Sequence, residues 1–322
     1  MRDRLALGCF FALAFAVSTA HAAPDAMRAG VVSGHGVEVR SIAVPTPDSG
    51  QVRVKVHAVS VNPVDWKLAD RGAAEGHTAG RDFSGTIDAL GGDAGTWKVG
   101  DPVIGIAANG SYAEYALASV HALAAKPQPL SFEQAAGLPV VAETAWRAMV
   151  TVADVRPGQK VLVQGGAGGV GSMAVQIAHA RGARVSATAS ADNAAFVRSL
   201  GAETVIDYHT TRFEDQLKGL DVVLNTVDAD TGLRSLRVLR PGGILVSIVG
   251  QPPAEPCAAA HVRCAITGSA TGEMLPFIVD LANQGKLRVS IEQQLPLAEA
   301  TRAWDLSRAG HIRGKVILKV TP

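Results

Sequence analysis

The chain has 322 residues, of which 48% are hydrophobic and 18% are charged, and its formal net charge is +1. This length is too great for one ordinary hydrophobic core and predicts two globular domains. The sequence has no basic run, and with its near-neutral charge this argues against nucleic acid and acidic surfaces as partners.

The N-terminal residues have the pattern of a secretory signal peptide. Arg2 and Arg4 precede an apolar run over 5–17, and small residues occupy the −3 and −1 positions of a cut after Ala22. The apolar run is too short to cross a bilayer, so we expect no membrane span. The pattern predicts a periplasmic or secreted protein. The alternative is a true start at Met27, which would leave the protein in the cytoplasm.

From Met27 onward the sequence is rich in short, alternating or apolar segments separated by Gly, Pro, Asn and Asp. Such segments at this spacing predict a small β-barrel. The expected strands are 29–32, 37–44, 52–60, 86–90, 102–107 and 111–117.

After Ser131, which opens a capping box with Gln134, strands and helices alternate. This alternation predicts a doubly wound parallel sheet, so the fold class is α/β. Strands are expected at 161–165, 184–189, 204–207, 221–227 and 243–249, with a further one near 262–268. Helices are expected at 170–181, 191–200, 211–218 and 230–239. The last part of the chain predicts helices at 274–284 and 299–307, an extended segment at 291–297 and a final strand at 314–320.

The stretch 161–171 is the most informative one, because an aliphatic strand leads into a glycine cluster and then an apolar-faced helix. Glycines let the backbone approach a pyrophosphate, and a helix start offers free N–H groups. The pattern predicts a dinucleotide site rather than a glycine-rich turn in an unrelated α/β domain.

The second strand of this unit indicates which nicotinamide nucleotide binds. NAD sites usually have an acidic side chain at the end of that strand, whereas here it ends in Ala189 and Ser190. Asp192 follows two residues later, where it could simply favour the helix start. Ser190, Asn193 and Tyr208 could line a 2′-phosphate pocket, although no Lys or Arg stands beside them. NADPH is therefore expected, with NADH less favoured.

The cysteine count argues against a metal site. Catalytic zinc needs three protein ligands, commonly including Cys, and the chain has only Cys9, Cys257 and Cys264. We therefore expect no zinc. Once the signal peptide is removed, Cys257 and Cys264 are the only thiols. They could form a disulfide in an oxidising compartment or remain two unpaired cysteines.

Taken together, these features resemble the zinc-free quinone oxidoreductase branch of the medium-chain dehydrogenase/reductase superfamily, including its alkenal reductase-like members. The resemblance covers about 27–320. It rests on the segments 61–67 (VNPVDWK), 80–85 (GRDFSG), 99–103, 110–115, 144–146, 168–171, 200–208, 240–243 and 313–316. Where zinc-containing relatives would have a His-Glu ligand pair, this chain has Arg81 and Asp82.

After the expected signal peptide over 1–22, the resemblance implies a GroES-like catalytic domain over 27–143. A Rossmann NADP-binding domain over 144–270 comes next, and a C-terminal segment over 271–322 returns to the catalytic domain. It also implies a quinone or enone substrate and a possible homodimer.

The resemblance also assigns site residues by position. Asn62 and Lys67 would be catalytic, since without a metal the developing enolate needs hydrogen-bond or charge donors. The cofactor would be bound by Thr144, Gly166, Gly168, Gly169, Val170, Ser190, Asn193, Tyr208, Val227, Val249 and Lys315.

Three positions depart from the family pattern. Asn193 replaces a frequent Lys or Arg, and Asn225 and Asp228 replace the usual Asp and Gly. The alternative function is therefore a non-catalytic nucleotide-binding protein on the same fold.

Overall fold

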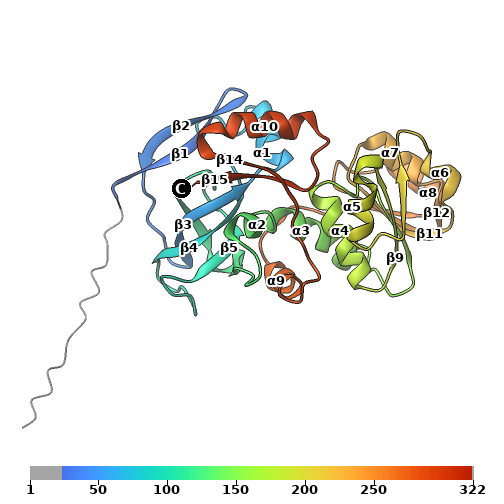
Figure 1. Ribbon diagram of the computed structural model, residues 1–322, viewed down its shortest axis with the longest axis horizontal. Helices are drawn as coiled ribbons and strands as arrows, with labels where there is room; N and C mark the ends of the chain where they lie inside the picture. The colour runs from blue at the N-terminus through green and yellow to red at the C-terminus, as the bar shows by residue number, and fades with distance from the viewer. Residues whose placement is uncertain (1–23, 321–322) are drawn as a thin grey trace, which may run out of the picture.

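The computed structural model describes residues 24–320 and has two bodies side by side, joined by helices between them (Figure 1). The predicted signal peptide, including Cys9, lies outside the described residues. Within 24–320, no helix combines the length and apolar character needed to cross a membrane.

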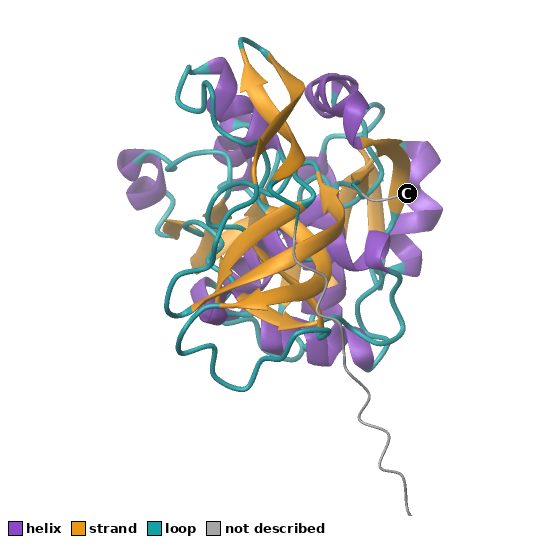
Figure 2. Ribbon diagram, turned by 90° about the vertical axis from the view of Figure 1, so that its left-hand side faces the viewer, coloured by secondary structure: helices purple, strands orange, loops and turns teal. Residues whose placement is uncertain are grey.

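The first body is a barrel-like arrangement of mostly antiparallel strands, and it faces the viewer in Figure 2. Its seven-stranded sheet has the order β14-β15-β3-β4-β5-β7, with β6 also paired to β3, and the hairpin β1-β2 lies beside it. The strands are β1 (Ala26–Ser33), β2 (Gly36–Ala43), β3 (Gln51–Ser60), β4 (Asp82–Leu90), β5 (Pro102–Ile106), β6 (Tyr115–Ser119), β7 (Leu123–Ala125), β14 (Ile291–Pro296) and β15 (Lys315–Lys319).

The burial pattern of strand β3 shows why this sheet has one apolar inner face. Val52, Val54 and Val56 alternate along it and are fully buried, whereas Lys55 between them is exposed. Alternation places all three valines on the inner face of the sheet, which buries apolar surface on one side only. The neighbouring strand β4 can lie close to β3 because Gly85 has no side chain. A Cβ at Gly85 would lie 2.2 Å from the Lys55 carbonyl oxygen.

The second body is a parallel sheet of six strands in the order β10-β9-β8-β11-β12-β13, with helices on both faces (Figure 1). This confirms the predicted doubly wound fold. The strands are β8 (Lys160–Val163), β9 (Arg184–Ala189), β10 (Thr204–Asp207), β11 (Leu220–Asn225), β12 (Leu239–Ser247) and β13 (Arg263–Ile266).

The predicted helices occur in the expected order, and the structure adds others that were not predicted. The helices are α1 (Pro63–Asp70), α2 (Phe132–Ala136), α3 (Pro139–Trp146), α4 (Gly169–Ala180), α5 (Ala194–Ser199), α6 (Phe213–Gln216), α7 (Ala229–Ser235), α8 (Ala254–Ala259), α9 (Leu275–Asn283) and α10 (Ala300–Ala309). Of these, α1, α3 and α8 were not predicted. The capping box at Ser131 and Gln134 forms as predicted, before α2.

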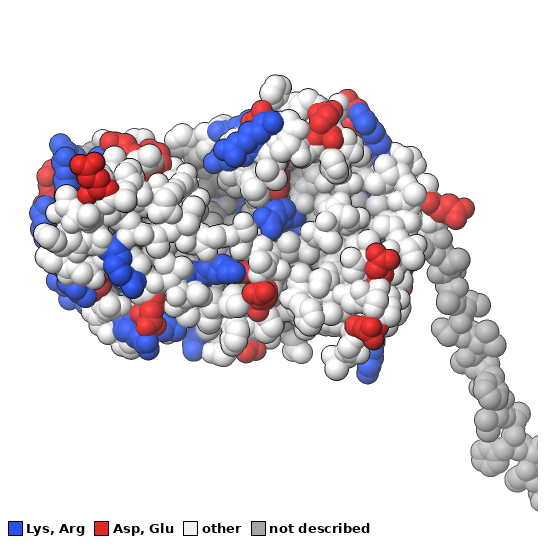
Figure 3. Space-filling model, turned by 180° about the vertical axis from the view of Figure 1, so that it is seen from behind, with Lys and Arg blue, Asp and Glu red and all other residues white. Residues whose placement is uncertain are grey.

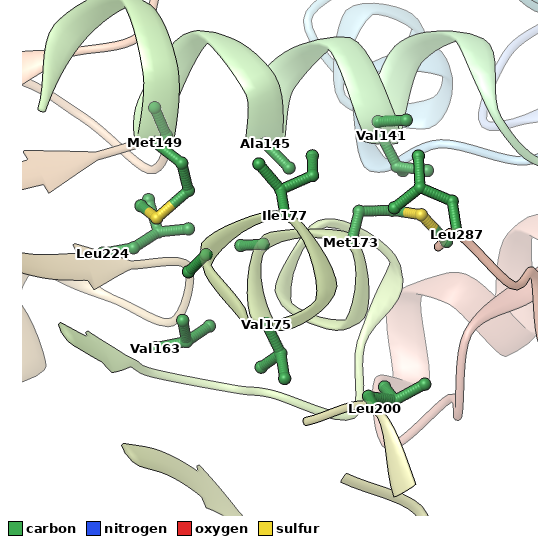
Figure 4. Packing of buried hydrophobic residues seen from close by; sticks show 14 of the residues in the cluster. Val141, Ala145, Met149, Val163, Met173, Val175, Ile177, Leu200, Leu224 and Leu287 are labelled. Atoms are coloured by element: carbon green, nitrogen blue, oxygen red, sulfur yellow. The ribbon is translucent and has the colours of Figure 1, made fainter. Parts of the chain in front are cut away.

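Helix α4 is buried on both sides, because it packs between the sheet and α3. Met173 and Ile177 point toward α3, where they meet Val141, Ala145 and Met149 (Figure 4). On its other side Val175 faces the sheet and Leu200. The helix that follows the glycine loop is therefore held firmly in place.

Two predicted elements were misplaced. The expected strand over 111–117 is β6 at Tyr115–Ser119, and Tyr112 lies in the loop before it. The side chain of Tyr112 is fully buried and hydrogen-bonded, so its backbone follows that contact rather than a strand ladder. The expected helix over 191–200 begins as a 3₁₀ turn over Ala191–Asn193 and continues as α5.

Candidate active site in the cleft between the two bodies

Two adjoining cavities occupy the cleft between the bodies, and Figure 3 shows the surface hollowed there. The smaller one, about 290 Å³, lies against β15 and the start of α4. The larger one, about 1220 Å³, lies at the carboxyl ends of β8, β9 and β10. Both cavities are lined by Gly168, Thr226, Gly310, His311 and Ile312. A ligand long enough to span both would therefore cross the glycine loop.

The glycine loop between β8 and α4 forms as predicted. Gly168 is the N-cap of α4 and lines both cavities, while Gly169 and Val170 line the smaller one. Gly171 packs against the loop itself, where an added Cβ would lie 2.1 Å from the Gly165 carbonyl oxygen. The exposed N–H groups of this helix start suit a pyrophosphate.

Gly166 has a packing role instead. A Cβ at Gly166 would lie 2.8 Å from the Cβ of Ala187 on β9, and the residue does not line either cavity of the cleft. It lets the loop pass close to the sheet, which positions the residues that do face the cleft.

The predicted 2′-phosphate residues come together in the larger cavity. Ser190, Asn193, Tyr208 and Val227 line it, and the Asn193 amide donates a 3.1 Å hydrogen bond to the Ser190 hydroxyl. The structure adds residues that sequence reasoning did not single out, because they follow β10 rather than β9: His209, Thr211 and Arg212.

The smaller cavity has a buried lysine in its wall. Lys315 is only 4% exposed, and its Nζ donates 2.7 Å hydrogen bonds to the carbonyl oxygen of Val61 and to Oδ1 of Asn62. Burial lowers the pKa of Lys315, while nearby carboxylates oppose that effect. The predicted cofactor residue and the predicted catalytic residue are thus direct partners.

Behind Asn62 lies a buried carboxylate, Asp82. Its Oδ2 accepts from the Asn62 amide at 3.0 Å and from the Ser60 hydroxyl at 2.5 Å, and its Oδ1 accepts from the Val140 backbone at 3.0 Å. Burial raises the pKa of Asp82, and Lys315 and these donors counteract the shift. Asp82 therefore fixes the Asn62 amide, which in turn presents its oxygen to Lys315.

A second buried carboxylate lies at the start of α1. Asp65 accepts hydrogen bonds from the Asn62 backbone at 2.9 Å and from the Tyr112 hydroxyl at 3.1 Å, and Trp304 donates to that hydroxyl at 3.3 Å. Its other oxygen, Oδ1, is buried without a partner. Burial raises the pKa of Asp65 to about 7.

Lys67 is not part of this group. Its side chain is exposed and its Nζ lies 5.4 Å from the centre of the Trp66 ring. It does not line either cavity of the cleft, nor does Thr144, whose hydroxyl bonds to the Val140 carbonyl oxygen. Val249 lines a separate, smaller cavity beyond β12. The roles of these three residues remain predictions.

The donor set does not fit zinc. Asp82, in the segment where zinc-containing relatives would have ligands, is already bound by Ser60, Asn62 and Val140. Residues 24–320 contain no group of three His, Cys, Asp or Glu side chains that could hold a metal ion.

Cys257 of α8 and Cys264 of β13 form a disulfide. Of the two alternatives that the sequence left open, a disulfide or two unpaired cysteines, the structure has the disulfide.

Fold and site together define a two-domain nucleotide-binding protein of the dehydrogenase type. A family model described as an alcohol dehydrogenase GroES-like domain matches residues 48–128, and one described as a zinc-binding dehydrogenase matches residues 200–318. The chain belongs to the medium-chain dehydrogenase/reductase superfamily, among its quinone oxidoreductase and alkenal/one reductase types.

Individual relatives cover nearly the whole chain. It is 33% identical to 2-methylene-furan-3-one reductase of Solanum lycopersicum, over 97% of this chain and 84% of that protein. It is 32% identical to the chloroplastic NADPH-dependent alkenal/one oxidoreductase of Arabidopsis thaliana, over 93% and 81%. The solved quinone oxidoreductase of Coxiella burnetii superposes with a TM-score of 0.85 at 34% identity, over 92% of this chain and all of the other.

Proposed function

We propose that this chain is an NADPH-dependent, metal-free reductase whose substrate is a quinone or an α,β-unsaturated carbonyl compound. The observation that carries the proposal is the pair of joined cavities, which meet at the glycine loop and end at Lys315. The relatives named as enone and quinone reductases support the substrate class, and the one named for NADPH supports the cofactor.

The cleft fits a dinucleotide. Gly168, Gly169 and Val170 would hold the pyrophosphate at the start of α4, and the larger cavity would take the adenosine end. The smaller cavity would then take the nicotinamide, which supplies the hydride when bound.

Lys315 places a positive charge in the wall of the smaller cavity, where reduction would build negative charge on a carbonyl or quinone oxygen. Asn62 acts through Lys315, because its amide is held between Lys315 and Asp82. In this proposal Asn62 and Asp82 are positioning residues. Lys67 remains a predicted donor that would have to reach the cleft from the surface of α1.

The test is NADPH oxidation by the purified chain with a simple quinone and with a simple enone, repeated with NADH and after treatment with a chelator. We expect turnover with at least one substrate, a preference for NADPH, and no effect of the chelator. Nucleotide binding without turnover of either substrate would favour the non-catalytic alternative. Activity lost to the chelator and restored by zinc would overturn the metal-free proposal.

We also propose a homodimer. The support is that β13 is the last strand of its sheet and carries Ile266, which is 45% exposed. Edge strands of this kind are available for pairing with another chain. Light scattering checks the mass in solution, and a monomer at micromolar concentration would contradict the proposal.

A further inference from the structure

The ends of β9 and β10 lie side by side at the larger cavity. The two strands are parallel, with Asp207 opposite Ala189, so the residues that follow each strand emerge at the same edge of the sheet. In a nucleotide-binding fold of this type, the second strand ends at the ribose hydroxyls of the adenosine. The segment after β10 therefore borders the place where a 2′-phosphate would lie.

The larger cavity is lined by side chains of both signs. The charged or titratable ones are Asp192, Tyr208, His209, Arg212, Asp228, Arg234 and His311. Asp228 caps α7, because its carboxylate accepts from the Thr231 backbone at 2.7 Å. The two arginines decide what the cavity can bind, since Arg is suited to bidentate recognition of phosphate.

Arg234 already forms an ion pair with Glu214. Its guanidinium makes two hydrogen bonds to the carboxylate of Glu214, at 2.6 Å and 2.8 Å, and Glu214 is only 5% exposed. This paired geometry satisfies both partners, so turning Arg234 toward a ligand would leave a buried carboxylate alone.

Arg212 is held much more loosely. Within residues 24–320 its guanidinium makes one hydrogen bond and ion pair, 3.5 Å long, to the Glu214 oxygen that Arg234 already binds, and the side chain is 62% exposed. Arg212 can therefore turn into the cavity without breaking a strong interaction. No Lys or Arg stands beside Asn193 in the sequence. Arg212 supplies a cation to the same cavity from the segment that follows the neighbouring strand, β10.

We propose that Arg212 binds the 2′-phosphate of NADPH, together with the Ser190 hydroxyl and the Asn193 amide, and so determines the preference for NADPH over NADH. This inference rests on the proposed function. Arg212 would then be a specificity-determining residue on the segment after β10. It lies across from the end of β9, where a charged residue was expected.

The experiment measures binding of adenosine 2′,5′-bisphosphate and of 5′-AMP by calorimetry to the full chain, in the wild type and in Arg212→Gln. We expect the variant to bind the bisphosphate at least about tenfold more weakly and 5′-AMP as the wild type does, because only the 2′-phosphate is contacted. The matched control is Arg237→Gln, which removes the same charge from an exposed position of the same domain outside the cavity. It should bind both probes as the wild type does.

Three results would overturn the inference: equal weakening of both probes in Arg212→Gln, no weakening of either, or the same weakening in Arg237→Gln. These failures are separate from failure of the proposed function. If the wild type reduces quinones or enones with NADPH and Arg212→Gln keeps its bisphosphate affinity, the function stands and the inference fails. If Arg212 controls bisphosphate binding but no substrate is reduced, the inference stands and the function fails.

Discussion

Lys315 and Asn62 lie 253 positions apart in the sequence and share a 2.7 Å hydrogen bond. Sequence reasoning selected both, one for the cofactor and one for catalysis, but it could not connect them. Their contact depends on β15 joining β3 in one sheet, which is a property of the tertiary fold. Asp82 was noted only as a departure from a zinc motif, although it anchors the pair.

Lys315 in the wall of the cleft and Lys67 on the surface of α1 should behave differently when replaced. We expect Lys315→Met to lower the free energy of unfolding by about 3 kcal/mol, because it leaves two acceptors without their donor and Asp82 without its nearby cation. Turnover should fall as well, whereas Lys67→Met, an exposed change, should leave stability unaltered.

Chemical denaturation and steady-state kinetics on both variants check this prediction. If Lys67→Met abolishes turnover while Lys315→Met only reduces stability, then Lys67 reaches the substrate and the buried lysine is structural.

Asp65 should make stability depend on pH. Burial raises the pKa of Asp65 in the folded chain to about 7, from an ordinary value of 3.8. Between these values the unfolded chain loses this proton and the folded chain keeps it. Stability should therefore fall as pH rises from about 4 to about 7.

In Asp65→Asn that fall should be smaller than in the wild type, measured by urea denaturation at several pH values. The control is Asp280→Asn at an exposed position, which should leave the slope unchanged. An identical slope in Asp65→Asn and the wild type would contradict the assignment.

At the scale of elements, the strands of the nucleotide-binding body and most of its helices were predicted within a few residues, because each one has its own apolar period and turn signals. Helices α3 and α8 were not predicted. The joint between α3 and α4 was not predicted. There a π-helix over Arg147–Val152 continues α3, and no local sequence pattern predicts it. Helix α1 was also missed, although Asn62 and Asp65 form a capping box at its start and Pro63 is its first residue.

The glycine loop offers a pair of substitutions that separates packing from binding. In Gly171→Ala the new Cβ would lie 2.1 Å from a backbone oxygen, so we expect a loss of about 2 kcal/mol in stability. In Gly168→Ala the nearest atom is 3.6 Å away, so stability should be retained.

Because Gly168 lines both cavities, its alanine variant should still bind NADPH more weakly. Thermal unfolding and fluorescence titration with NADPH test the pair. Unchanged NADPH affinity in Gly168→Ala would place the pyrophosphate elsewhere.

The disulfide links α8 to the edge strand β13 across a sequence separation of 7. Closing so short a loop stabilises the fold by about 2.5 kcal/mol in the chain-entropy model. Adding a reductant should therefore lower the melting temperature, and the double variant Cys257→Ser, Cys264→Ser should melt at the reduced value. Equal melting temperatures with and without reductant would show that the bond contributes nothing.

At the scale of the whole molecule, the sequence predicted two bodies and the return of the chain to the first one, because ordered motifs extend over nearly all of it. It did not predict the size or shape of the cleft. Cavity walls are built from loop residues such as Gly310, His311 and Ile312, whose positions depend on how the two bodies pack.

Export is the prediction that concerns the entire chain. We expect expression of the full reading frame to give a mature protein that begins at Ala23 and carries no free thiol, recovered from the periplasm or medium. Mass measurement of the N-terminal peptide and thiol counting on unfolded, unreduced material check it. A cytoplasmic protein that begins at Met27 with two free thiols would support the alternative start.

The bridge between Gly314 and Gly168, and the pairing of β15 with β3, also have a consequence for the order in which this protein can be made. Strand β15 and the cleft residues Gly310, His311, Ile312 and Gly314 come later in the chain than the other residues that line the cleft, apart from Lys315 and Val316 of β15 itself. Until they emerge, β3 pairs with β4 and β6 but lacks β15, and the glycine loop lacks Gly314 beside it. The smaller cavity, which Lys315 and Val316 line, can therefore be complete only after synthesis has passed residue 316.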